Sequence, residues 1–516
     1  MTGDFRCSRR GFLTAGSLLT AGALAGCTSV PSATGVSVHA FDRPLSIPPL
    51  AQSRLEGGVR IFELTVRFGE TSFSPATADG TMTRTLGYNG DFLGPTLRAE
   101  RGEKVVVSIR NQLDDTTSVH WHGMHLPARM DGGPHQEIAP GGTWEPEWTI
   151  DQPAATLWYH PHPHGRTEEQ VYHGLAGLFL LDDDVSLGAD LPRDYGIDDI
   201  PVIVMDKSFD DDGQLELHDD GGEPGMLGDT VLVNGSICPL FEVSRERLRL
   251  RLLNGSTARS YDFGLGESAM TLIATDGGFL DEPLPIDSIR LAPGERAEVI
   301  ATFTPGQTLR LHSAKVDLGA VAAPFAMGGN DAFDVLEFRA AADLGSSPEP
   351  AWASSEHAEK DRLHESEASV ERRFELDERT INGRTMDMSR VDDVIQVGAT
   401  EIWTVRNNLP MPHSFHIHDV QFRLLDIDGT APAEYLAGPK DTMYLEPKRD
   451  YRLLLRFTDY TDPHVPYMYH CHMLLHEDEG MMGQFLVVGP GQVPSTRIDG
   501  AEPGGIAGTG QHSGHH

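Results

Sequence analysis

The sequence predicts an all-β protein built from three consecutive β-sandwich domains. Short segments of alternating apolar and polar residues are separated by turns rich in Gly, Pro and Asp, and long helical periodicity is scarce. A divergent threefold repeat runs through the body of the chain, and 516 residues are enough for more than one domain. Together these observations favour three sandwiches over any helical or α/β arrangement.

Each copy of the repeat contains an alternating strand, a polar turn and a second strand. The first copy reads LRAERGEKVVVSIRNQ and then TSVHWHG, the second FEVSRERLRLRLLNGS and then ARSYDFGLG, and the third VIQVGATEIWTVRNN and then HSFHIHD. A proline-containing turn follows in every copy, at residues 139–142, 291–294 and 445–447, and each turn precedes a strand rich in apolar residues.

We expect the three domains at residues 45–185, 198–345 and 372–490. Residues 346–371 are polar and charged and are typical of a linker. The Gly-rich residues 491–516 are typical of a disordered tail, in which copper capture is a minor alternative for His512, His515 and His516.

The stretch YHCHMLLHEDEGMM in the third copy carries the ligand types of a blue-copper site. Cys471 offers a thiolate, His476 an imidazole and Met481 a weak axial thioether. The start of the stretch reads as the end of a strand, so His470 and His472 share one face and Cys471 takes the other. The thiolate can then bind one copper while its two neighbours bind metal on the far side of the backbone.

Three further His-x-His pairs supply ligands for a second centre: His120 and His122, His160 and His162, His416 and His418. On a strand both rings of each pair point the same way. His413 would complete the blue site with Cys471, His476 and Met481. One such pair alone is as readily a surface or core feature. Four pairs together with the cysteine motif indicate a copper centre, and eight imidazoles suit three metal ions.

With these motifs in this order, the chain resembles the three-domain bacterial multicopper oxidases, the group that includes laccases, cuprous oxidases and bilirubin oxidases. The resemblance spans roughly residues 40–490 and implies cupredoxin-like Greek-key domains with four copper ions, one of type 1, one of type 2 and two of type 3. It implies type 2 ligation by His120 and His416. It implies type 3 ligation by His122, His160, His162, His418, His470 and His472, whereas His164 aligns with a position that is not a ligand.

The middle copy carries none of these pairs. Where the outer copies have His-x-His, it has Tyr261, Asp262 and Phe263. The eight imidazoles therefore belong to the first and third domains, and we expect the trinuclear cluster at their interface. The middle domain is expected to act as a spacer.

The implied reaction needs both electrons and protons. Cys471 would pass electrons from the blue site to the cluster, where O2 takes four electrons and four protons to give two waters. Asp131 and Glu477 match acids that donate protons in the bacterial members of the group. The alternatives are a plain turn for Asp131 and a simple acidic run for Glu477 with Asp478 and Glu479.

The electron donor is less well defined by the sequence. Cuprous oxidases of this group carry a methionine-rich insertion over the blue site, but here no Met lies between Met327 and Met386. A more open blue site favours phenols and aromatic amines that give up electrons near His476. Oxidation of Cu(I) for copper detoxification in the cell envelope is the alternative.

One remaining group of thioethers keeps the Cu(I) alternative open. Met411 stands two residues before His413, at the methionine position of the family's copper-entry site, but Leu409 replaces the expected acid. Met411, Met386 and Met388 would form a small soft-ligand patch, although such residues more often fill gaps in a core.

The first 30 residues read as an export signal. SRRGFL, from Ser8, is a twin-arginine motif, and the apolar run that follows it is shorter than the ~20 residues a membrane span needs. The sequence LAGC resembles a lipobox, which predicts lipidation of Cys27, with ordinary cleavage nearby as the alternative. We therefore expect a periplasmic or cell-surface protein, with a lipid anchor at Cys27 favoured.

Composition limits the partners. The net charge is −36, with 77 acidic and 41 basic residues, so nucleic acid is not an expected partner. The acidic surface either favours cations or simply aids solubility. Outside the signal only Cys238 and Cys471 occur, and Cys238 is expected to pack as a small apolar residue. A monomer is sufficient, because one chain supplies both sides of the expected cluster.

Other classes of protein remain to be weighed against an oxidase. Some members of the resembling family have lost copper and assist cell division as scaffolds, but the intact Cys471 and the full set of histidines disfavour that reading. A mononuclear copper carrier would not need the histidines of the first domain, and a two-domain nitrite reductase would not need all four pairs in one chain.

Overall fold

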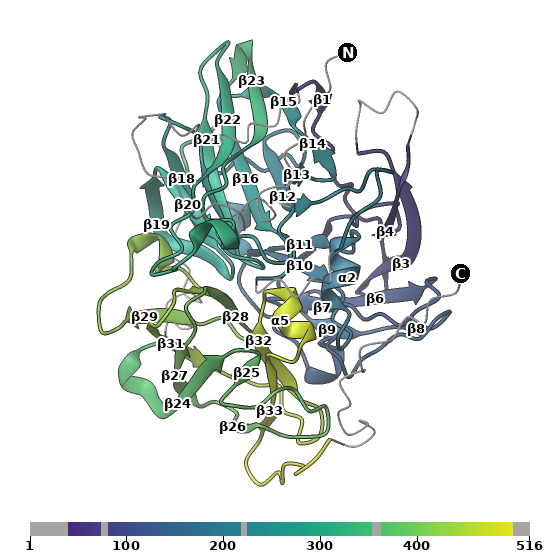
Figure 1. Cartoon of the computed structure of the whole chain (residues 1–516), viewed down its shortest axis with the longest axis vertical. Coiled ribbons are helices and arrows are strands. Elements are labelled where there is room, and N and C mark those ends of the chain that lie inside the picture. The colour runs from purple at the N-terminus through teal and green to yellow at the C-terminus, as the bar shows by residue number, and fades with distance from the viewer. Residues whose placement is uncertain (1–39, 74–80, 218–223, 353–362, 499–516) are drawn as a thin grey trace, which may run out of the picture. The chain divides into compact units, whose positions relative to one another are not determined.

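The structure is a computed structural model that describes residues 40–73, 81–217, 224–352 and 363–498. The predicted export signal, Cys27 and the three tail histidines lie outside the described residues. Six sheets form three β-sandwiches in chain order, so the all-β prediction is confirmed. In Figure 1 the strands of each sandwich gather as one range of colour, from purple and blue through teal to green and yellow, except that the purple β1 pairs with β15 of the second sandwich.

The first sandwich packs the sheet β2-β3-β6-β8, to which β4 and β9 are joined, against the sheet β5-β11-β10-β7. Its core includes Phe62, Val107, Leu157 and Phe179. Its elements are β2 (Ser53–Glu56), β3 (Val59–Thr71), β4 (Thr83–Tyr88), β5 (Leu97–Glu100), β6 (Lys104–Asn111), β7 (His120–His122), η1 (Ala128–Met130), β8 (Thr143–Trp144), β9 (Glu147–Thr149), β10 (Ala155–His160), α2 (Thr167–Tyr172), β11 (Gly177–Asp182) and α3 (Asp184–Gly188).

The second sandwich packs the sheet β14-β13-β12-β16-β21-β18-β19 against the sheet β1-β15-β23-β22-β17-β20. Val202, Leu250, Phe263 and Leu311 lie in its core. Its elements are β1 (Arg43–Pro44), β12 (Asp199–Lys207), β13 (Thr230–Val233), β14 (Ser236–Ile237), β15 (Pro239–Arg245), β16 (Arg247–Asn254), β17 (Tyr261–Gly264), β18 (Met270–Thr275), β19 (Gly278–Ile286), β20 (Ser288–Leu291), β21 (Arg296–Thr302), β22 (Thr308–Ala314), η2 (Pro324–Met327) and β23 (Phe333–Gly345).

The third sandwich packs the sheet β25-β24-β27-β31-β29 against the sheet β26-β33-β32-β28-β30. Its core is aromatic, with Phe374, Trp403, Phe415 and Tyr469 in mutual contact. Its elements are η3 (Glu365–Glu367), β24 (Ala368–Asp377), β25 (Thr380–Ile381), β26 (Asp393–Gln396), β27 (Thr400–Asn407), β28 (His413–Ile417), β29 (Arg423–Ile427), η4 (Glu434–Leu436), β30 (Thr442–Leu445), β31 (Asp450–Arg456), β32 (Tyr467–Cys471), α5 (Leu474–Asp478) and β33 (Met482–Val488).

The structure differs from the predicted boundaries at two places. Strand β24 starts at Ala368, inside the predicted linker, because its polar residues lie on an exposed face while the strand pairs with β27. Beyond residue 491, the start of the predicted tail, Ile498 packs against Leu486 and Val488. Apolar contact therefore orders the chain as far as residue 498.

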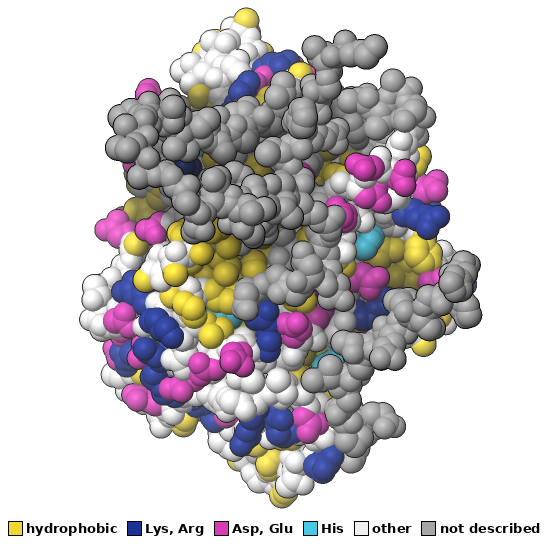
Figure 2. All heavy atoms as spheres, viewed as in Figure 1, with side chains coloured by type: hydrophobic (Ala, Val, Ile, Leu, Met, Phe, Trp, Pro, Cys, Tyr) yellow, Lys and Arg dark blue, Asp and Glu magenta, His cyan; other side chains and the backbone are white. Residues whose placement is uncertain are grey.

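The surface carries charges of both signs. Figure 2 shows acidic and basic side chains interspersed on the face in view. Within the described part of the chain, no helix has the length and apolar character that crossing a membrane requires.

Candidate metal centre

The predicted ligands come from strand ends in two of the sandwiches. In the first sandwich β7 and β10 are antiparallel, and their register places His120 opposite His160. In the third, β28 and β32 are antiparallel, and His416 lies opposite His470. Because residues two apart on a strand share a face, each His-x-His motif presents both rings to one side. All eight imidazoles of the four motifs are at most 1% exposed.

These eight imidazoles form one continuous cluster. Nε2 of His470 lies 3.3 Å from Nε2 of His162 and 3.2 Å from Nε2 of His418. The rings of His122 and His416 stack with centroids 3.7 Å apart. Three sets bring one nitrogen from each member within 4.8 Å of the others: His120, His122 and His160; His120, His416 and His418; His162, His418 and His470.

The cluster contains buried nitrogen atoms whose lone pairs bound metal ions would satisfy. Nε2 of His120, Nε2 of His416 and both ring nitrogens of His472 are buried and have no hydrogen-bond partner among the described residues. A buried polar atom without a partner costs about 1–3 kcal/mol. Imidazole nitrogens suit copper, so the residues present fit the ions that the resemblance implies.

A second constellation lies in the third sandwich. Sγ of Cys471 is 3.4 Å from Nδ1 of His413 and 3.5 Å from Nδ1 of His476, and the two nitrogens are 3.2 Å apart. One thiol and two imidazoles thus face a common point, which is the donor set of a blue-copper site. Met481 is fully buried in the same core cluster as Cys471, and its carbonyl accepts a hydrogen bond from the Cys471 N–H.

The two constellations are joined through β32. Cys471 packs in the core of the third sandwich, while His470 contacts His162 and His472 contacts His122, both of the first sandwich. The alternation of side chains along a strand therefore sends neighbouring residues to different metal sites. The path between the two sites runs through the side chain of Cys471, one peptide unit and the side chain of a neighbouring histidine.

Burial keeps most of the predicted imidazole ligands neutral. Desolvation, with charge on neighbouring groups as a further cause, holds the pKa of seven of them well below the usual 6.5: His122, His160, His162, His413, His416, His418 and His472. A neutral imidazole keeps a lone pair available for a metal ion.

Asp131 lies against the cluster. Its Oδ2 accepts a hydrogen bond from Nδ1 of His418 across 2.7 Å, and its carbonyl accepts one from Nδ1 of His120 across 2.9 Å. Its Oδ1 is buried without a hydrogen-bond partner among the described residues. One carboxylate oxygen therefore orients a predicted ligand, and the other lies 3.4 Å from Nδ1 of His120.

Glu477 bridges the imidazoles of two sandwiches. Oε1 lies 3.2 Å from Nδ1 of His162, and Oε2 lies 3.1 Å from Nδ1 of His470. The side chain is 1% exposed. Helix α5 carries both Glu477 and the blue-site residue His476, and it packs against α2 of the first sandwich (Figure 1).

Sequence reasoning missed one acid at the cluster. Oδ1 of Asp441 lies 3.0 Å from Nε2 of His122, and its carbonyl accepts a hydrogen bond from Nδ1 of His416 across 2.8 Å. The separation of Asp441 from the histidines along the sequence matches no metal-binding motif. It precedes β30, and the pairing of β30 with β28 brings it to the site.

The middle domain, expected to act as a spacer, also contacts the third sandwich beside the cluster. The carbonyl of Pro293 accepts a hydrogen bond from Ser414 of the third sandwich across 2.9 Å. A Cβ at Gly294 would lie 3.0 Å from ring atoms of His472. The proline-containing turn before β21 thus touches the wall of the cluster.

The methionines of the expected Cu(I) patch do not come together. Met386 and Met388 pack with Met468 and Met482, whereas Met411 lies in the aromatic core of the third sandwich. His164, which was not expected to bind metal, is exposed and joins none of the ligand sets among the described residues.

A thiolate–imidazole site next to a cluster of eight buried imidazoles, carried on β-sandwiches, defines a copper-dependent oxidoreductase with more than one copper site. Family models described as multicopper oxidase match residues 70–186, 209–310 and 358–490. The chain belongs to the multicopper oxidase family, and its domains have the cupredoxin-like fold of that family.

Curated relatives of two kinds resemble the chain. The multicopper oxidase mco of Staphylococcus aureus is 36% identical over 83% of this chain and 89% of its own length. The cell division protein FtsP of Escherichia coli (strain K12) is 35% identical over 93% of this chain and 98% of its own length.

Solved structures agree with the family. The laccase from Pediococcus acidilactici has a TM-score of 0.77 at 34% identity and covers 88% of this chain and 95% of its own. A laccase-like multi-copper oxidase CueO from Ochrobactrum sp., described as active towards lignin model compounds and lignosulfonate, has a TM-score of 0.77 at 34% identity. It covers 86% of this chain and 100% of its own.

Proposed function

We propose that this protein is a laccase-like oxidase that takes electrons one at a time from phenols or aromatic amines and passes them to O2, which is reduced to water. The observation that carries the proposal is the adjacency of Cys471 to His470 and His472, whose side chains belong to different sites. Electrons accepted at the blue site can then reach the cluster through a few covalent bonds.

The residues present would hold four copper ions. A type 1 ion fits His413, Cys471 and His476 with Met481 nearby, a type 2 ion fits His120 and His416, and a type 3 pair fits the other six clustered imidazoles. When bound, copper supplies one-electron redox chemistry at the first site and the binding and reduction of O2 at the others. The protein keeps these ligands neutral, buried and oriented.

Two acids would supply protons to the cluster. Asp131 holds His418 with one oxygen, and its other oxygen makes no hydrogen bond among the described residues. Glu477 lies between His162 and His470 on another side. Both carboxylates lie against imidazoles of the cluster, and a carboxyl in such a position can take up and release a proton through water.

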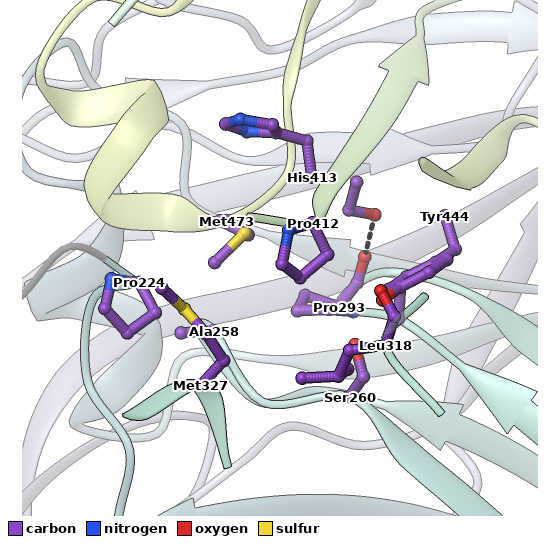
Figure 3. Close-up of a pocket in the computed structure, with 12 residues that line it drawn as sticks. Pro224, Ala258, Ser260, Pro293, Leu318, Met327, Pro412, His413, Tyr444 and Met473 are labelled. Carbon is purple, nitrogen blue, oxygen red and sulfur yellow. Dashed lines mark hydrogen bonds between the residues drawn. The ribbon is translucent and has the colours of Figure 1, made fainter. Parts of the chain in front are cut away.

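A small cleft lies beside His413. Its cavity volume is about 10 Å³, and proline, methionine and leucine side chains line it together with His413, Tyr444 and two serines. That volume suits about one water molecule, so we propose that an aromatic donor gives up its electron at the mouth of the cleft and not from within it. In Figure 3, Met473, Met327 and Pro224 lie on one side and Tyr444 and Leu318 on the other, with His413 above. Electron entry was expected near His476, but His476 does not line this cleft. We therefore propose entry at His413.

Cu(I) is the second candidate donor. Met327 and Met473 both line the cleft, and thioethers are soft ligands that bind Cu(I). They line the cleft together with His413, whereas Met411 is not among its lining residues. This arrangement favours the copper-detoxifying alternative more than the expected patch does.

Oxygen uptake by the copper-loaded protein separates the two donors. A dimethoxyphenol and Cu(I) would be compared, each with and without added Cu(II), in wild type and in Met327→Leu. Phenol oxidation that needs no added Cu(II) and survives Met327→Leu is the result that the laccase-like proposal expects. Fast Cu(I) oxidation that falls in Met327→Leu, with phenol oxidation only after Cu(II) addition, would replace it with cuprous oxidation.

A scaffold role without copper has the FtsP relatives in its favour. The complete ligand sets of both sites argue against it. Copper analysis after reconstitution decides: about four ions per chain supports the oxidase proposal, and none supports a scaffold.

We further propose twin-arginine export, lipidation at Cys27 and a monomeric state, all of which rest on the sequence. Cys27→Ala should release the protein from the cell envelope into the soluble fraction. An envelope association that Cys27→Ala leaves intact would rule out the anchor.

A further inference from the structure

The second sandwich reaches the cluster through a buried ion pair. Arg296, at the start of β21, donates from Nη1 to Oδ1 of Asp441 across 2.6 Å and from Nη2 to Oδ2 across 2.7 Å. Both side chains are 0% exposed. This bidentate geometry fixes the plane of the carboxylate as well as its position.

Asp441 in turn positions two predicted copper ligands, His122 and His416. Its Oδ1 accepts a hydrogen bond from Nε2 of His122, and Thr442 Oγ1 lies 2.9 Å from the same nitrogen. The proton therefore sits on Nε2, and the lone pair of His122 is on Nδ1. That atom faces Nε2 of His160 at 3.4 Å, inside the cluster. The hydrogen bond that one ring nitrogen makes selects the nitrogen left to bind metal.

Arg296 is itself held on several sides. Its guanidinium donates to the carbonyls of Thr156 at 3.0 Å, Asp276 at 2.9 Å and Gly294 at 3.2 Å. Asp276 also accepts the Arg296 backbone N–H at 2.7 Å. Lys440 lies 2.9 Å from Asp276, so charges of both signs alternate across the interface of the second and third sandwiches. The guanidinium has little freedom to follow a displaced carboxylate.

We propose that Arg296 is a positioning residue for the copper cluster. Acting through Asp441, Arg296 sets the orientation and the tautomer of His122. It also fixes the position of the Asp441 carbonyl, which accepts the hydrogen bond from Nδ1 of His416. The middle domain, which contributes no predicted ligand, thereby controls the geometry of the site between the outer domains. This inference rests on the proposed function, because it takes His122 and His416 as copper ligands.

A purely structural ion pair is the competing explanation, and the second sandwich offers a matched control. Arg249 on β16 is 4% exposed and pairs with Glu298 through Nε at 2.7 Å and Nη2 at 2.5 Å. It contacts none of the predicted ligands. Both nitrogens contact the same oxygen, Oε2, so Arg249→Lys removes a buried guanidinium–carboxylate pair of the one-oxygen kind without altering the support of His122.

The test compares Arg296→Lys and Arg249→Lys in the full chain. Lysine keeps the charge but cannot reproduce a bidentate fork. We expect both variants to melt at a lower temperature without copper. Only Arg296→Lys should change the type 2 electron paramagnetic resonance signal and lower copper affinity at the cluster by about 10- to 100-fold. The blue absorption from Cys471 should persist in both variants.

The outcomes separate the inference from the proposed function. A wild-type signal and wild-type copper affinity in Arg296→Lys, or equal changes in Arg249→Lys, would overturn the positioning role. A wild-type protein that shows no type 2 signal would instead overturn the proposed function. If Arg296→Lys does not fold, Asp441→Asn gives the same reading: a changed type 2 signal supports the inference, and an unchanged signal contradicts it.

Discussion

Oδ2 of Asp131 lies 2.7 Å from Nδ1 of His418, so a carboxylate of the first sandwich orients a predicted copper ligand of the third. The contact crosses the interface at which O2 is expected to react. Asp131 therefore orients His418 with Oδ2, in addition to the proton transfer that the resemblance implies. That proton transfer would use the other oxygen, Oδ1.

Asp131→Asn should leave copper content near that of wild type and slow turnover with O2 by about 10-fold or more. The amide still fills the space beside His418, but it cannot accept and return a proton. Steady-state oxygen uptake and copper analysis measure both effects. The control is Asp462→Asn, because Asp462 pairs with Arg129 at 2.7 Å and touches no predicted ligand. Unchanged turnover in Asp131→Asn would remove the relay role.

Cys471→Ser should abolish the blue colour and donor oxidation together, because serine supplies no thiolate. The cluster imidazoles remain in place, so the type 2 signal should persist. Cys238→Ser serves as a control, since Cys238 is the other described cysteine and packs in an apolar cluster of the second sandwich. Donor oxidation that survives Cys471→Ser would show that electrons enter elsewhere.

Gly294→Ala should disturb the cluster through His472. Gly294 has φ +86°, and a Cβ there would lie 3.0 Å from three ring atoms of His472. Gly306 has φ +75° with no atom within 4 Å of the corresponding Cβ, so Gly306→Ala carries the backbone strain alone. We expect each variant to lose about 1 kcal/mol of stability and only Gly294→Ala to lose cluster copper. Equal copper content in the two variants would contradict the contact.

His125 makes the interface of the first and third sandwiches sensitive to alkaline pH. Nδ1 lies 2.8 Å from Asp419 and Nε2 lies 2.9 Å from Asp459. Burial lowers the pKa of His125, but the charge of Asp419 and the hydrogen bonds to both acids outweigh burial and raise the pKa to about 10. The hydrogen bond from His125 lowers the pKa of Asp459, whereas burial raises the pKa of Asp419 against the charge of His125.

The folded-state pKa of His125 is above its unfolded value, so its stabilising contribution is complete below the usual 6.5 and is lost as pH rises toward about 10. His125→Asn should lower stability by about 2 kcal/mol at pH 6, because Asp459 is half-exposed and screening reduces the effect. Urea unfolding midpoints of the copper-free protein across this pH range measure it. Midpoints that fall equally with pH in wild type and variant would exclude His125 as the cause.

The sequence was sufficient to predict the parts of the site that local spacing records. Alternation on a strand assigns His470 and Cys471 to opposite faces, and the structure has that arrangement. The contact of Arg296 with Asp441 joins residues 145 apart and belongs to no short motif. It depends on how two sandwiches pack, which strand patterns do not specify. Met411 likewise appears in the expected position along the chain, but its side chain points into a core.

The number of donor electrons consumed for each O2, measured together with peroxide release, shows whether the blue site and the imidazole cluster work together. The copper-loaded protein would oxidise a dimethoxyphenol in an oxygen electrode with a peroxide assay in parallel. A linked blue site and imidazole cluster predict about four electrons for each O2 and no peroxide. About two electrons for each O2, with peroxide released, would show that the eight imidazoles do not act as a single oxygen-reducing centre.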